Sequence, residues 1–366
     1  MLNAQYDLVV IGAGPAGCAT AIIAGRAGAR VALLERGSYP RHKVCGEFVS
    51  PEALDLLASL LAEPHKPLLA EAPRISRSRI FLDGRILQTA ISPQAASIAR
   101  FDLDAALWES ARASGVETRE RTVVQRVEGA GPFDLVTSTG ELEARAVINA
   151  SGRWSNLRRS TEAAKPQEKW LGLKAHFLES KCEPSVDLFF FDGGYCGVQP
   201  VTLRHARENR VNVCAMVRSD IATSLPQVFS QHGELLERSR HWHQISDAVS
   251  TSPLNFATPR PLLQGMLLVG DAAGFVDPFV GDGISLALRS GAMAAGCLIP
   301  FFRSEKSIAE ASHSYEQAYR KHLAPVFRAS SRIRYTLRLP RRVRKPVLFA
   351  LEKNPAVTQF LVSKTR

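Results

Sequence analysis

The order of hydrophobic and polar positions near the N-terminus predicts a strand, a helix and a second strand in close succession. Apolar residues run from Tyr6 to Ile11, an Ala- and Ile-rich stretch follows a group of glycines, and a second apolar run covers Arg30–Leu34. Together these elements match the size of a βαβ unit, about 30 residues. The chain is therefore predicted to begin an α/β domain with a parallel sheet.

The middle of the chain is strand-rich instead. Residues 170–220 carry apolar runs separated by turn signals, and alternating strands are also predicted around Arg79–Gln88. The apolar strand Met266–Val269 then returns the chain to its first domain. We predict three parts: a discontinuous α/β domain, an inserted β-rich cap and a basic C-terminal segment that is helical in parts. Their bounds are 1–75, 95–160 and 260–300 for the α/β domain, 76–94 and 161–259 for the cap, and 301–366 for the segment.

Further elements follow from the same patterns. Strands are predicted at Glu120–Val127, Phe133–Ser138 and Ala146–Ala150. Helices are predicted at Pro51–Leu61, 101–114, Gly283–Ile299 and Ala309–His322.

Composition is that of an ordinary globular protein, since 45% of the residues are hydrophobic and 22% are charged. The six cysteines lie far apart without a C-x-x-C pair, which argues against a disulfide scaffold or a zinc ribbon and fits a reducing compartment. No apolar run approaches the about 18 residues of a membrane-spanning helix, and the early first strand leaves no room for a signal peptide. These features predict a soluble, cytoplasmic protein.

The net charge of +11 is concentrated at one end of the chain. Residues 303–366 hold 15 Lys/Arg against 4 Asp/Glu, so the first 302 residues are neutral with 31 of each. This distribution argues against a nucleic-acid-binding surface. The segment Arg332–Leu351 mixes arginines with apolar residues, so it either packs on the α/β domain with solvated arginines, which we favour, or makes a peripheral contact with anionic lipid.

A dinucleotide-binding fingerprint follows the first strand. Gly12-Ala13-Gly14-Pro15-Ala16-Gly17 is G-x-G-x-x-G between a strand and a helix. The glycines allow the tight turn, the close approach of a diphosphate and the packing of helix on strand, while the helix N-terminus attracts the anion. Glu35 ends the second strand, where its carboxylate can bind ribose hydroxyls, and we assign the neighbouring Arg36 and Val124 to the same site. The domain is therefore predicted to be Rossmann-like.

A second block distinguishes FAD from NAD. The strand Leu267–Val269 leads into Gly270-Asp271-Ala272-Ala273-Gly274, followed by Pro278 and by Gly281-Asp282-Gly283-Ile284. Asp271 is placed to bind hydroxyls of a ribityl chain. A helix that starts near Gly283 would direct its positive end at the N1–C2=O edge of a reduced flavin. We therefore predict non-covalent FAD.

At these residues the chain resembles FAD-dependent oxidoreductases of the geranylgeranyl reductase and p-hydroxybenzoate hydroxylase type, which include flavin-dependent halogenases. The resemblance covers about residues 6–300. It implies that Arg41, Cys45 and Gly46, within Arg41-His42-Lys43-Val44-Cys45-Gly46-Glu47, lie beside the flavin, and that Arg100 reaches the cofactor from the side. It also places Tyr195, in the strand Gly193–Pro200, on the substrate side of the cap.

Three departures from the family pattern bear on activity. Gly197 and Gln199 replace large apolar residues of the cap strand, which argues against a prenyl tunnel of the usual shape. Ala150-Ser151-Gly152 lacks the aspartate with which related hydroxylases contact FAD and the nicotinamide. The halogenase motif W-x-W-x-I-P is absent, and His241-Trp242-His243 resembles it only superficially.

Candidate catalytic residues are Cys45 and Tyr195. Cys45 is either a thiol that orients or reacts with substrate or a small buried residue, and Tyr195 is either a hydrogen-bond donor or a core aromatic. We predict no metal site, because His241 and His243 lack a carboxylate partner at matching spacing.

The predicted function is oxidation or reduction of a largely apolar small molecule, by flavin monooxygenation or by double-bond reduction. NADPH, NADH or a separate reductase would supply electrons. A flavin halogenase and a non-enzymatic flavin-binding module are the alternatives.

Overall fold

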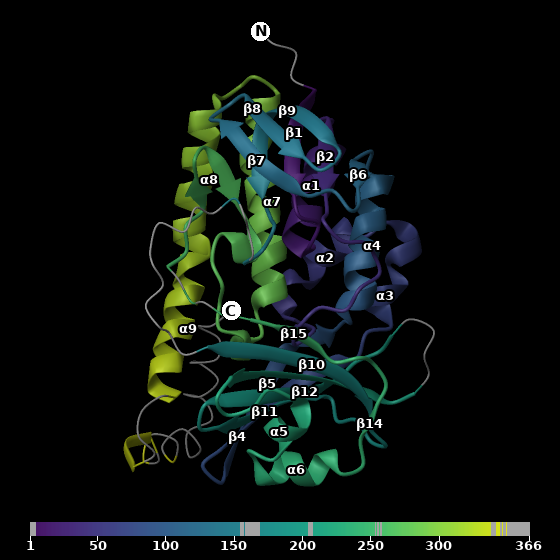
Figure 1. The fold of residues 1–366 in the computed structure, drawn as a ribbon, viewed down its shortest axis with the longest axis vertical. Coiled ribbons are helices and arrows are strands. Elements are labelled where there is room, and N and C mark those ends of the chain that lie inside the picture. Colours follow the sequence, from purple (N-terminus) through teal and green to yellow (C-terminus); the bar gives the residue numbers. More distant parts are fainter. Residues whose placement is uncertain are drawn as a thin grey trace.

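The computed structural model describes residues 5–153, 157, 169–203, 208–252, 254, 256, 258–337, 342–344, 346 and 349. It contains two sheets, one above the other in Figure 1. The upper sheet has the order β16-β17-β9-β1-β2-β6, and β7 and β8 extend it from β9. Its strands are β1 (Tyr6–Ile11), β2 (Val31–Leu34), β6 (Glu117–Arg119), β7 (Val124–Gly129), β8 (Phe133–Thr137), β9 (Gly140–Asn149), β16 (Leu262–Leu263) and β17 (Met266–Leu268).

Parallel pairing in the centre of this sheet confirms the predicted α/β class. β1 runs parallel to both β2 and β9, and β17 runs parallel to β9. The strands β1, β2 and β17 are fully or almost fully buried, as the continuous apolar runs predicted. Consequently the carboxyl ends of β1, β2, β9 and β17 meet at one edge of the sheet.

Seven helices of the described residues lie outside the cap. They are α1 (Pro15–Arg26), α2 (Leu54–Leu60), α3 (Pro67–Ala70), α4 (Arg100–Ala113), α7 (Gly283–Phe302), α8 (Ile308–His322) and α9 (Ala324–Leu337). α1 and α7 lie very close together, because a Cβ atom on Gly291 would be 2.2 Å from the carbonyl oxygen of Ala16. Thr20 Oγ1 donates to the carbonyl of Gly291 at 3.1 Å across the same contact.

α7 is long and apolar enough to cross a membrane by length and composition, which our reading of the sequence did not anticipate. Half of its apolar window is buried inside the fold, and it packs between α1 and α8. Its apolar composition is therefore explained by packing in the core of the fold. It also continues through Pro300 to Phe302, past the predicted end at Ile299.

The lower sheet has the order β14-β10-β13-β12-β11-β4-β5-β3, and β15 pairs with β10. Its strands are β3 (Phe48–Val49), β4 (Arg74–Leu82), β5 (Arg85–Ser97), β10 (Trp170–Leu178), β11 (Ser185–Phe191), β12 (Gly194–Pro200), β13 (Arg210–Arg218), β14 (His243–Gln244) and β15 (Val249–Thr251). β10 to β13 pair antiparallel, whereas β11 joins β4 in parallel.

The two faces of this sheet have different neighbours. Leu173, Ala175 and Phe177 of β10 belong to an apolar core with residues of α5 (Leu225–Phe229) and α6 (Gly233–Ser239), at the bottom of Figure 1. Alternate residues of β10 point the other way, toward the upper sheet. A Cβ atom on Gly172 would lie 2.9 Å from Val44 Cγ1, which shows how closely the two parts approach.

One predicted strand was wrong at its start. The strand expected at Glu120–Val127 begins only at Val124. Arg121 has a φ of 52°, in the left-handed region, and its N–H donates to the carbonyl of Gly37 at 3.1 Å. The chain therefore turns at Arg121 before β7 can start.

The C-terminal segment contacts the fold at two places: α9 before Arg332, and Arg344, whose partner Asp83 belongs to the predicted cap and not to the α/β domain that we favoured. Val326, Phe327 and Ser330 of α9 are buried. Beyond α9, Arg344 donates to both carboxylate oxygens of Asp83 at 2.7 and 2.9 Å. Much of the remaining segment lies outside the described residues.

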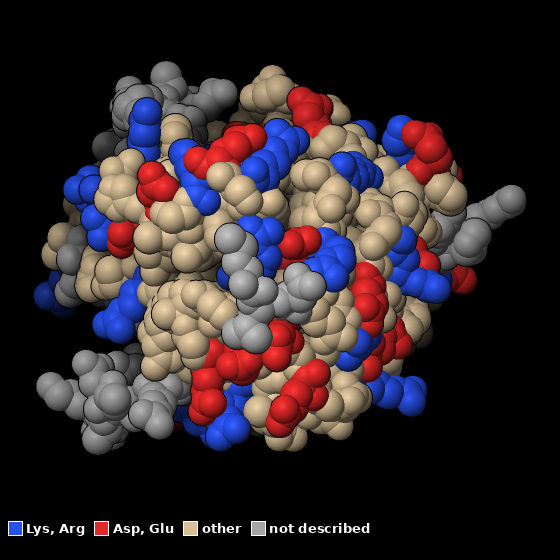
Figure 2. All heavy atoms as spheres, turned by 90° about the horizontal axis from the view of Figure 1, so that it is seen from above, with Lys and Arg blue, Asp and Glu red and all other residues tan. Residues whose placement is uncertain are grey.

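Opposite charges are interspersed on the end of the molecule seen in Figure 2. That face shows no field of a single sign.

Candidate functional site

A cavity of about 840 Å³ lies between the two sheets, at the edge where the parallel strands end. This volume is in the upper part of the range for ligand pockets, about 300–1,000 Å³. Most of the predicted site residues line it: Gly12, Gly14, Pro15, Ala16, Glu35, Arg36, Cys45, Gly46, Arg100, Val124, Tyr195, Gly270, Asp271, Gly281, Gly283 and Ile284. The predicted residues Ala13, Gly17 and Arg41 are not among the lining residues.

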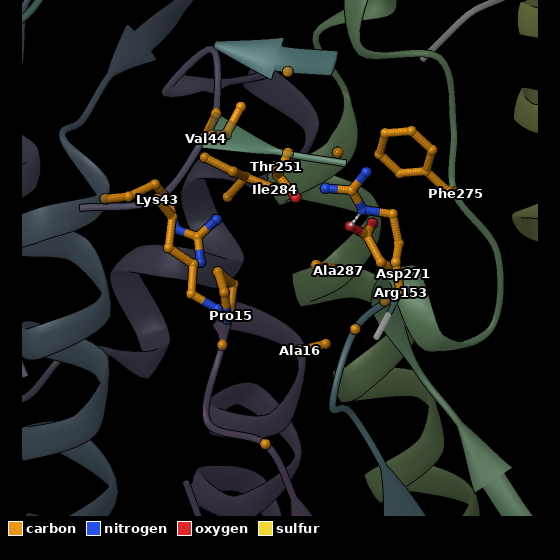
Figure 3. Close-up of a pocket in the computed structure, with 18 of the residues that line it drawn as sticks. Pro15, Ala16, Lys43, Val44, Arg153, Thr251, Asp271, Phe275, Ile284 and Ala287 are labelled. Carbon is orange, nitrogen blue, oxygen red and sulfur yellow. Dashed lines mark ion pairs between the residues drawn. The ribbon is translucent and has the colours of Figure 1, made fainter. Parts of the chain in front are cut away.

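The fingerprint glycines form a turn that only glycine allows. Gly12 has a φ of 97°, and a Cβ atom on it would be 2.6 Å from the carbonyl oxygen of Ala150. A Cβ atom on Gly17 would be 1.9 Å from the carbonyl oxygen of Gly12. The turn directs the N-terminus of α1, which begins at Pro15, into the cavity, as Figure 3 shows. This arrangement fits the diphosphate of a dinucleotide.

Glu35 is held by three donors. Its Oε2 accepts the N–H of Ala13 at 3.0 Å, and its Oε1 accepts the N–H of Gly37 at 3.0 Å and Arg41 Nη1 at 2.8 Å. Burial opposes ionisation of this carboxyl, but the hydrogen bond and charge of Arg41 outweigh it and lower the pKa of Glu35 to about 2. Glu35 is therefore an anion at the end of β2, ready to accept hydroxyl hydrogen bonds, and Arg41 acts on the site through Glu35.

The opposite end of the cavity carries Asp271 and Arg153. Arg153 Nε lies 3.7 Å from Asp271 Oδ2, and its guanidinium lies 4.3 Å from the ring centroid of Phe275 (Figure 3). Burial raises the pKa of Asp271, while the charge of Arg153 opposes that rise. Arg153 Nη1 is buried and has no hydrogen-bond partner among the described residues. A polar ligand in the cavity would find both an acceptor and a donor here.

The N-terminus of α7 opens onto the same space. Gly281 has a φ of 76°, and a Cβ atom on Gly283 would meet nothing within 4 Å. The helix start is therefore unobstructed, which fits an anionic ring edge. Beside it, Ser50 Oγ donates to Asp282 Oδ1 at 2.7 Å, and burial raises the pKa of Asp282 to about 6.

Cys45 lies on the segment between Arg41 and Phe48 and lines the cavity. The N–H of Glu47 donates to Cys45 Sγ at 3.3 Å. Burial raises the pKa of Cys45, although the charge of Arg100 opposes the rise. Arg100 is itself anchored by α4, because it donates to both carboxylate oxygens of Asp104 at 2.6 and 2.7 Å. The thiol is therefore protonated at neutral pH.

The cap supplies an apolar wall. Tyr195 and Met216 belong to a cluster with Leu254 that also includes Phe275 and Phe279. The rings of Tyr195 and Phe279 stand edge to face with centroids 6.1 Å apart. This wall would accept a hydrophobic ligand.

Gly197 and Gln199 of β12, which depart from the family pattern, both have close packing or hydrogen-bond partners. Gln199 is buried and donates from Nε2 to Ser97 Oγ at 2.6 Å. A Cβ atom on Gly197 would be 3.3 Å from Leu188 Cδ2, so Leu188 occupies the room that a larger side chain would need.

Several lining residues were missed by sequence reasoning: Lys43, Glu47, Arg153, Met216 and Phe275. Lys43 and Glu47 belong to the family-like segment Arg41–Glu47, so the resemblance alone could have identified them as site residues. Burial, with the charge of Arg100, lowers the pKa of Lys43 to about 8. His241 and His243 are exposed, and the described residues include no cluster of three or more metal-ligating side chains. Trp154 lies outside the described residues.

The fold and the cavity together define an FAD-binding oxidoreductase. A family model for the FAD binding domain matches residues 5–329, and the chain belongs to that family. It is an FAD-dependent enzyme of the superfamily that contains geranylgeranyl-type reductases. The donors and acceptors described above fit FAD: the α1 N-terminus and Glu35 at the ADP half, and Asp271 and the α7 N-terminus at the flavin half.

Known proteins resemble the chain over most of its length. It is 26% identical over 353 residues to digeranylgeranylglycerophospholipid reductase 1 of Methanopyrus kandleri, covering 90% of each chain. It is 26% identical over 362 residues to the menaquinone reductase of Mycolicibacterium smegmatis, covering 93% of this chain and 86% of that one. It is also 25% identical to conditioned medium factor receptor 1 of Dictyostelium discoideum, covering 81% of this chain but only 64% of that protein.

A solved structure supports the fold alone. The flavin-dependent brominase Bmp2 superposes with a TM-score of 0.79 at 19% identity, covering 98% of this chain and 93% of that one.

Proposed function

We propose that this protein uses FAD to reduce an activated double bond in an apolar molecule such as a prenyl lipid or a lipid-linked quinone. The observation that carries the proposal is the pairing of a protonated thiol, Cys45, with the apolar wall of Tyr195 and Met216 in the cavity that carries the FAD-binding features. The similarity to reductases of prenylated lipids and of menaquinone over about nine-tenths of the chain supports the same substrate class.

The roles of the chain's residues follow from the geometry. The turn Gly12–Gly17 and Glu35 would hold the ADP half of FAD, and Asp271 with the N-terminus of α7 would hold the flavin half. FAD, when bound and reduced, would supply a hydride equivalent to one carbon of the double bond. Cys45 would donate a proton to the neighbouring carbon, so that the double bond gains one hydride and one proton, and solvent would return a proton to the thiolate. Tyr195 and Met216 would exclude water from the reacting carbons.

The experiment is anaerobic reduction of the FAD-loaded protein, followed by mixing with a menaquinone or a prenylated alkene in one arm and with O₂ in the other. The reductase proposal expects reoxidation of the flavin without oxygen together with a product that has lost one carbon–carbon double bond, and formation of a quinol alone would contradict it. Oxygen incorporation into substrate that depends on O₂, or halide incorporation when halide is added, would replace the proposal by monooxygenation or by halogenation.

The electron donor is proposed from the chemistry of the family. NADPH or NADH would reduce the flavin directly, or a separate reductase would do so. Stopped-flow reduction with each nucleotide tests this, and slow reduction by both would assign the role to a partner protein, in line with Ser151 in place of an aspartate.

An apolar substrate would reach the cavity from lipid. Arg328, Arg332 and Tyr335 are exposed along α9, and we assign them a peripheral contact with anionic membranes. Co-sedimentation with phosphatidylglycerol vesicles, weakened by salt, is expected. Equal binding to neutral vesicles would contradict it.

A further inference from the structure

A buried cluster of titratable side chains joins the cap to the segment that carries Cys45. Glu47 Oε1 accepts a hydrogen bond from Lys174 Nζ at 2.8 Å, and Glu47 Oε2 lies 2.7 Å from His176 Nε2. None of these three side chains is more than 1% exposed. Lys174 and His176 occupy alternate positions of β10 and so share the sheet face that looks toward the upper domain. The cluster therefore joins β10 to the segment that leads from Cys45 into β3.

Further hydrogen bonds tie the same segment down. The N–H of Glu47 donates to Cys45 Sγ at 3.3 Å, and Glu47 Oε1 also accepts the N–H of Arg100 at 2.8 Å. From β13, Asn212 Nδ2 donates to the carbonyls of Cys45 and Gly46 at 3.1 and 2.9 Å. Both carbonyls beside the thiol are thus held by the cap.

The cluster carries a free-energy cost, in backbone strain and desolvation, that a role in fold stability alone would not require. Glu47 has a φ of 62°, a left-handed conformation that is unfavourable for a non-glycine residue. Burying a carboxylate with a lysine and a histidine also costs desolvation, and apolar residues of similar volume often stabilise a fold as well or better. Backbone strain of this kind is found at active sites and ligand clamps.

We propose that Glu47, Lys174 and His176 form a positioning cluster that locks the Cys45–Gly46 segment to the cap, so that the thiol and the apolar wall move as one unit. The inference rests on the proposed function, because the substrate is taken to lie between that thiol and that wall. Glu47 is then a positioning residue that acts through Cys45.

The charges around Cys45 predict how ionisation of its thiol changes when Glu47 is substituted. Arg100 at the start of α4 favours the thiolate, as do the N–H of Glu47 and, more remotely, Arg153 after β9. The carboxylate of Glu47 disfavours the thiolate, and the charge of Cys214 on β13 also interacts with Cys45. Removing the carboxylate while keeping its shape therefore favours the thiolate and loosens the segment.

The test measures alkylation of Cys45 by iodoacetamide in the FAD-loaded protein across pH, with peptide mass mapping to separate it from the other cysteines. We expect Glu47→Gln to raise the rate at neutral pH about tenfold and to move the profile to lower pH. Asn212→Leu removes the two carbonyl ties but no charge, so it should raise the rate without moving the profile. The double variant Glu47→Gln with Lys174→Met leaves no lysine–carboxylate charge unpaired, so it keeps the test valid if the single variant fails to fold.

The matched control lies on the other face of the cap. Asp187, on β11, is also buried in ion pairs, with Arg79 at 2.5 Å and Arg238 at 2.6 Å. Asp187→Asn should destabilise the protein yet leave the alkylation profile of Cys45 at that of the parent.

The proposal is overturned if the Glu47 variants lower the melting temperature but alkylate like the parent, or if Asp187→Asn changes Cys45 as much as they do. Restoration of the parent profile by Glu47→Asp would support a role for the carboxylate. Because the assay needs no substrate, its result stands apart from any failure of the proposed reductase activity.

Discussion

Glu35 and Arg41 form a 2.8 Å ion pair at the carboxyl end of β2, with the Glu35 side chain only 6% exposed. The same carboxylate accepts the N–H of Ala13 from the fingerprint turn. Arg41 therefore orients the residue that faces the cavity while lying outside the lining itself. If Glu35 binds the ribose of FAD as proposed, the ADP half of the site would depend on this three-part contact.

We expect Glu35→Ala to weaken FAD binding by about 1.5–3 kcal/mol, the worth of a hydrogen bond to a charged group, and to leave the fold intact. Titration of the flavin-free protein with FAD, followed by fluorescence, measures the change. Glu63→Ala is the matched control, because its carboxylate is 83% exposed. Unchanged affinity in Glu35→Ala would show that Glu35 does not contact the ribose.

Substitutions of two glycines should have different effects, one on the stability of the fold and the other on FAD binding. Gly17→Ala places a Cβ atom 1.9 Å from the carbonyl oxygen of Gly12, so β1 and α1 can no longer pack and the melting temperature should fall sharply. Gly283→Ala adds a methyl group into open space at the start of α7, so it should leave the flavin-free protein stable but weaken FAD binding. Melting curves with and without FAD separate the two effects. Equal loss of stability in both variants would argue that Gly283 has a packing role.

Asp282 predicts a pH-dependent stability. Its folded pKa of about 6 lies above the ordinary value of 3.8, so ionisation is disfavoured in the folded state. A stability penalty therefore grows as pH rises from 3.8 to about 6 and is complete above that, amounting to about 3 kcal/mol at 1.36 kcal/mol per unit. Asp282→Asn keeps an acceptor for Ser50 and removes the penalty. In denaturant unfolding, the free energy of unfolding of the variant should rise relative to that of the parent between pH 4 and pH 7. A difference that stays constant over this range would show that the pKa of Asp282 is not raised.

Local signals account for the parts of the fold that were predicted closely. β1 matches the predicted strand, and α1 and β2 follow as expected, because continuous apolar runs and glycines specify them within the chain. β4 was expected only from Arg79, yet it starts at Arg74. Its outer face carries arginines whose partners are distant in sequence, such as Asp187 for Arg79 at 2.5 Å. The order of polar and apolar residues within the strand does not indicate such partners.

The candidate site divides in the same way. Gly12 and Asp271 belong to motifs whose spacing reflects backbone requirements, so the sequence alone indicates them. Met216 lines the cavity because the cap folds back over the upper sheet, and Arg153 after β9 is brought to Asp271 by the pairing of β9 with β17. Their place depends on packing between segments far apart in the chain, which periodicity does not encode.

Tyr195 tests whether the cap wall works by shape or by hydrogen bonding. Its ring packs against Phe190 at 5.4 Å and Phe279 at 6.1 Å between centroids, so the aromatic body is the larger part of its contact. We expect Tyr195→Phe to leave the KM for an apolar substrate within about twofold, and Tyr195→Ala to raise that KM and also to lower the stability of the fold by about 3–5 kcal/mol, as large-to-small changes of buried aromatics do. Steady-state kinetics with a series of prenyl chain lengths measures both. A large effect of Tyr195→Phe would instead assign the hydroxyl a direct contact with substrate.

Cys45 carries the proton in the proposed reduction, so its substitution should separate chemistry from cofactor binding. Cys45→Ser keeps the size of the side chain but replaces the thiol by a far weaker acid. We expect FAD retention to be unchanged and the rate of substrate reduction to fall by about 10²–10⁴-fold, the usual contribution of a positioned acid. In the parent, burial raises the pKa of the thiol, so the donor is protonated at neutral pH and the rate should fall only as pH rises through that raised value. The measurement is single-turnover reoxidation of the reduced protein by alkene or quinone, followed from pH 6 upward. If Cys45→Ser turned over at the parent rate with the same alkaline limb, the proton would come from another group and Cys45 would be only a packing residue.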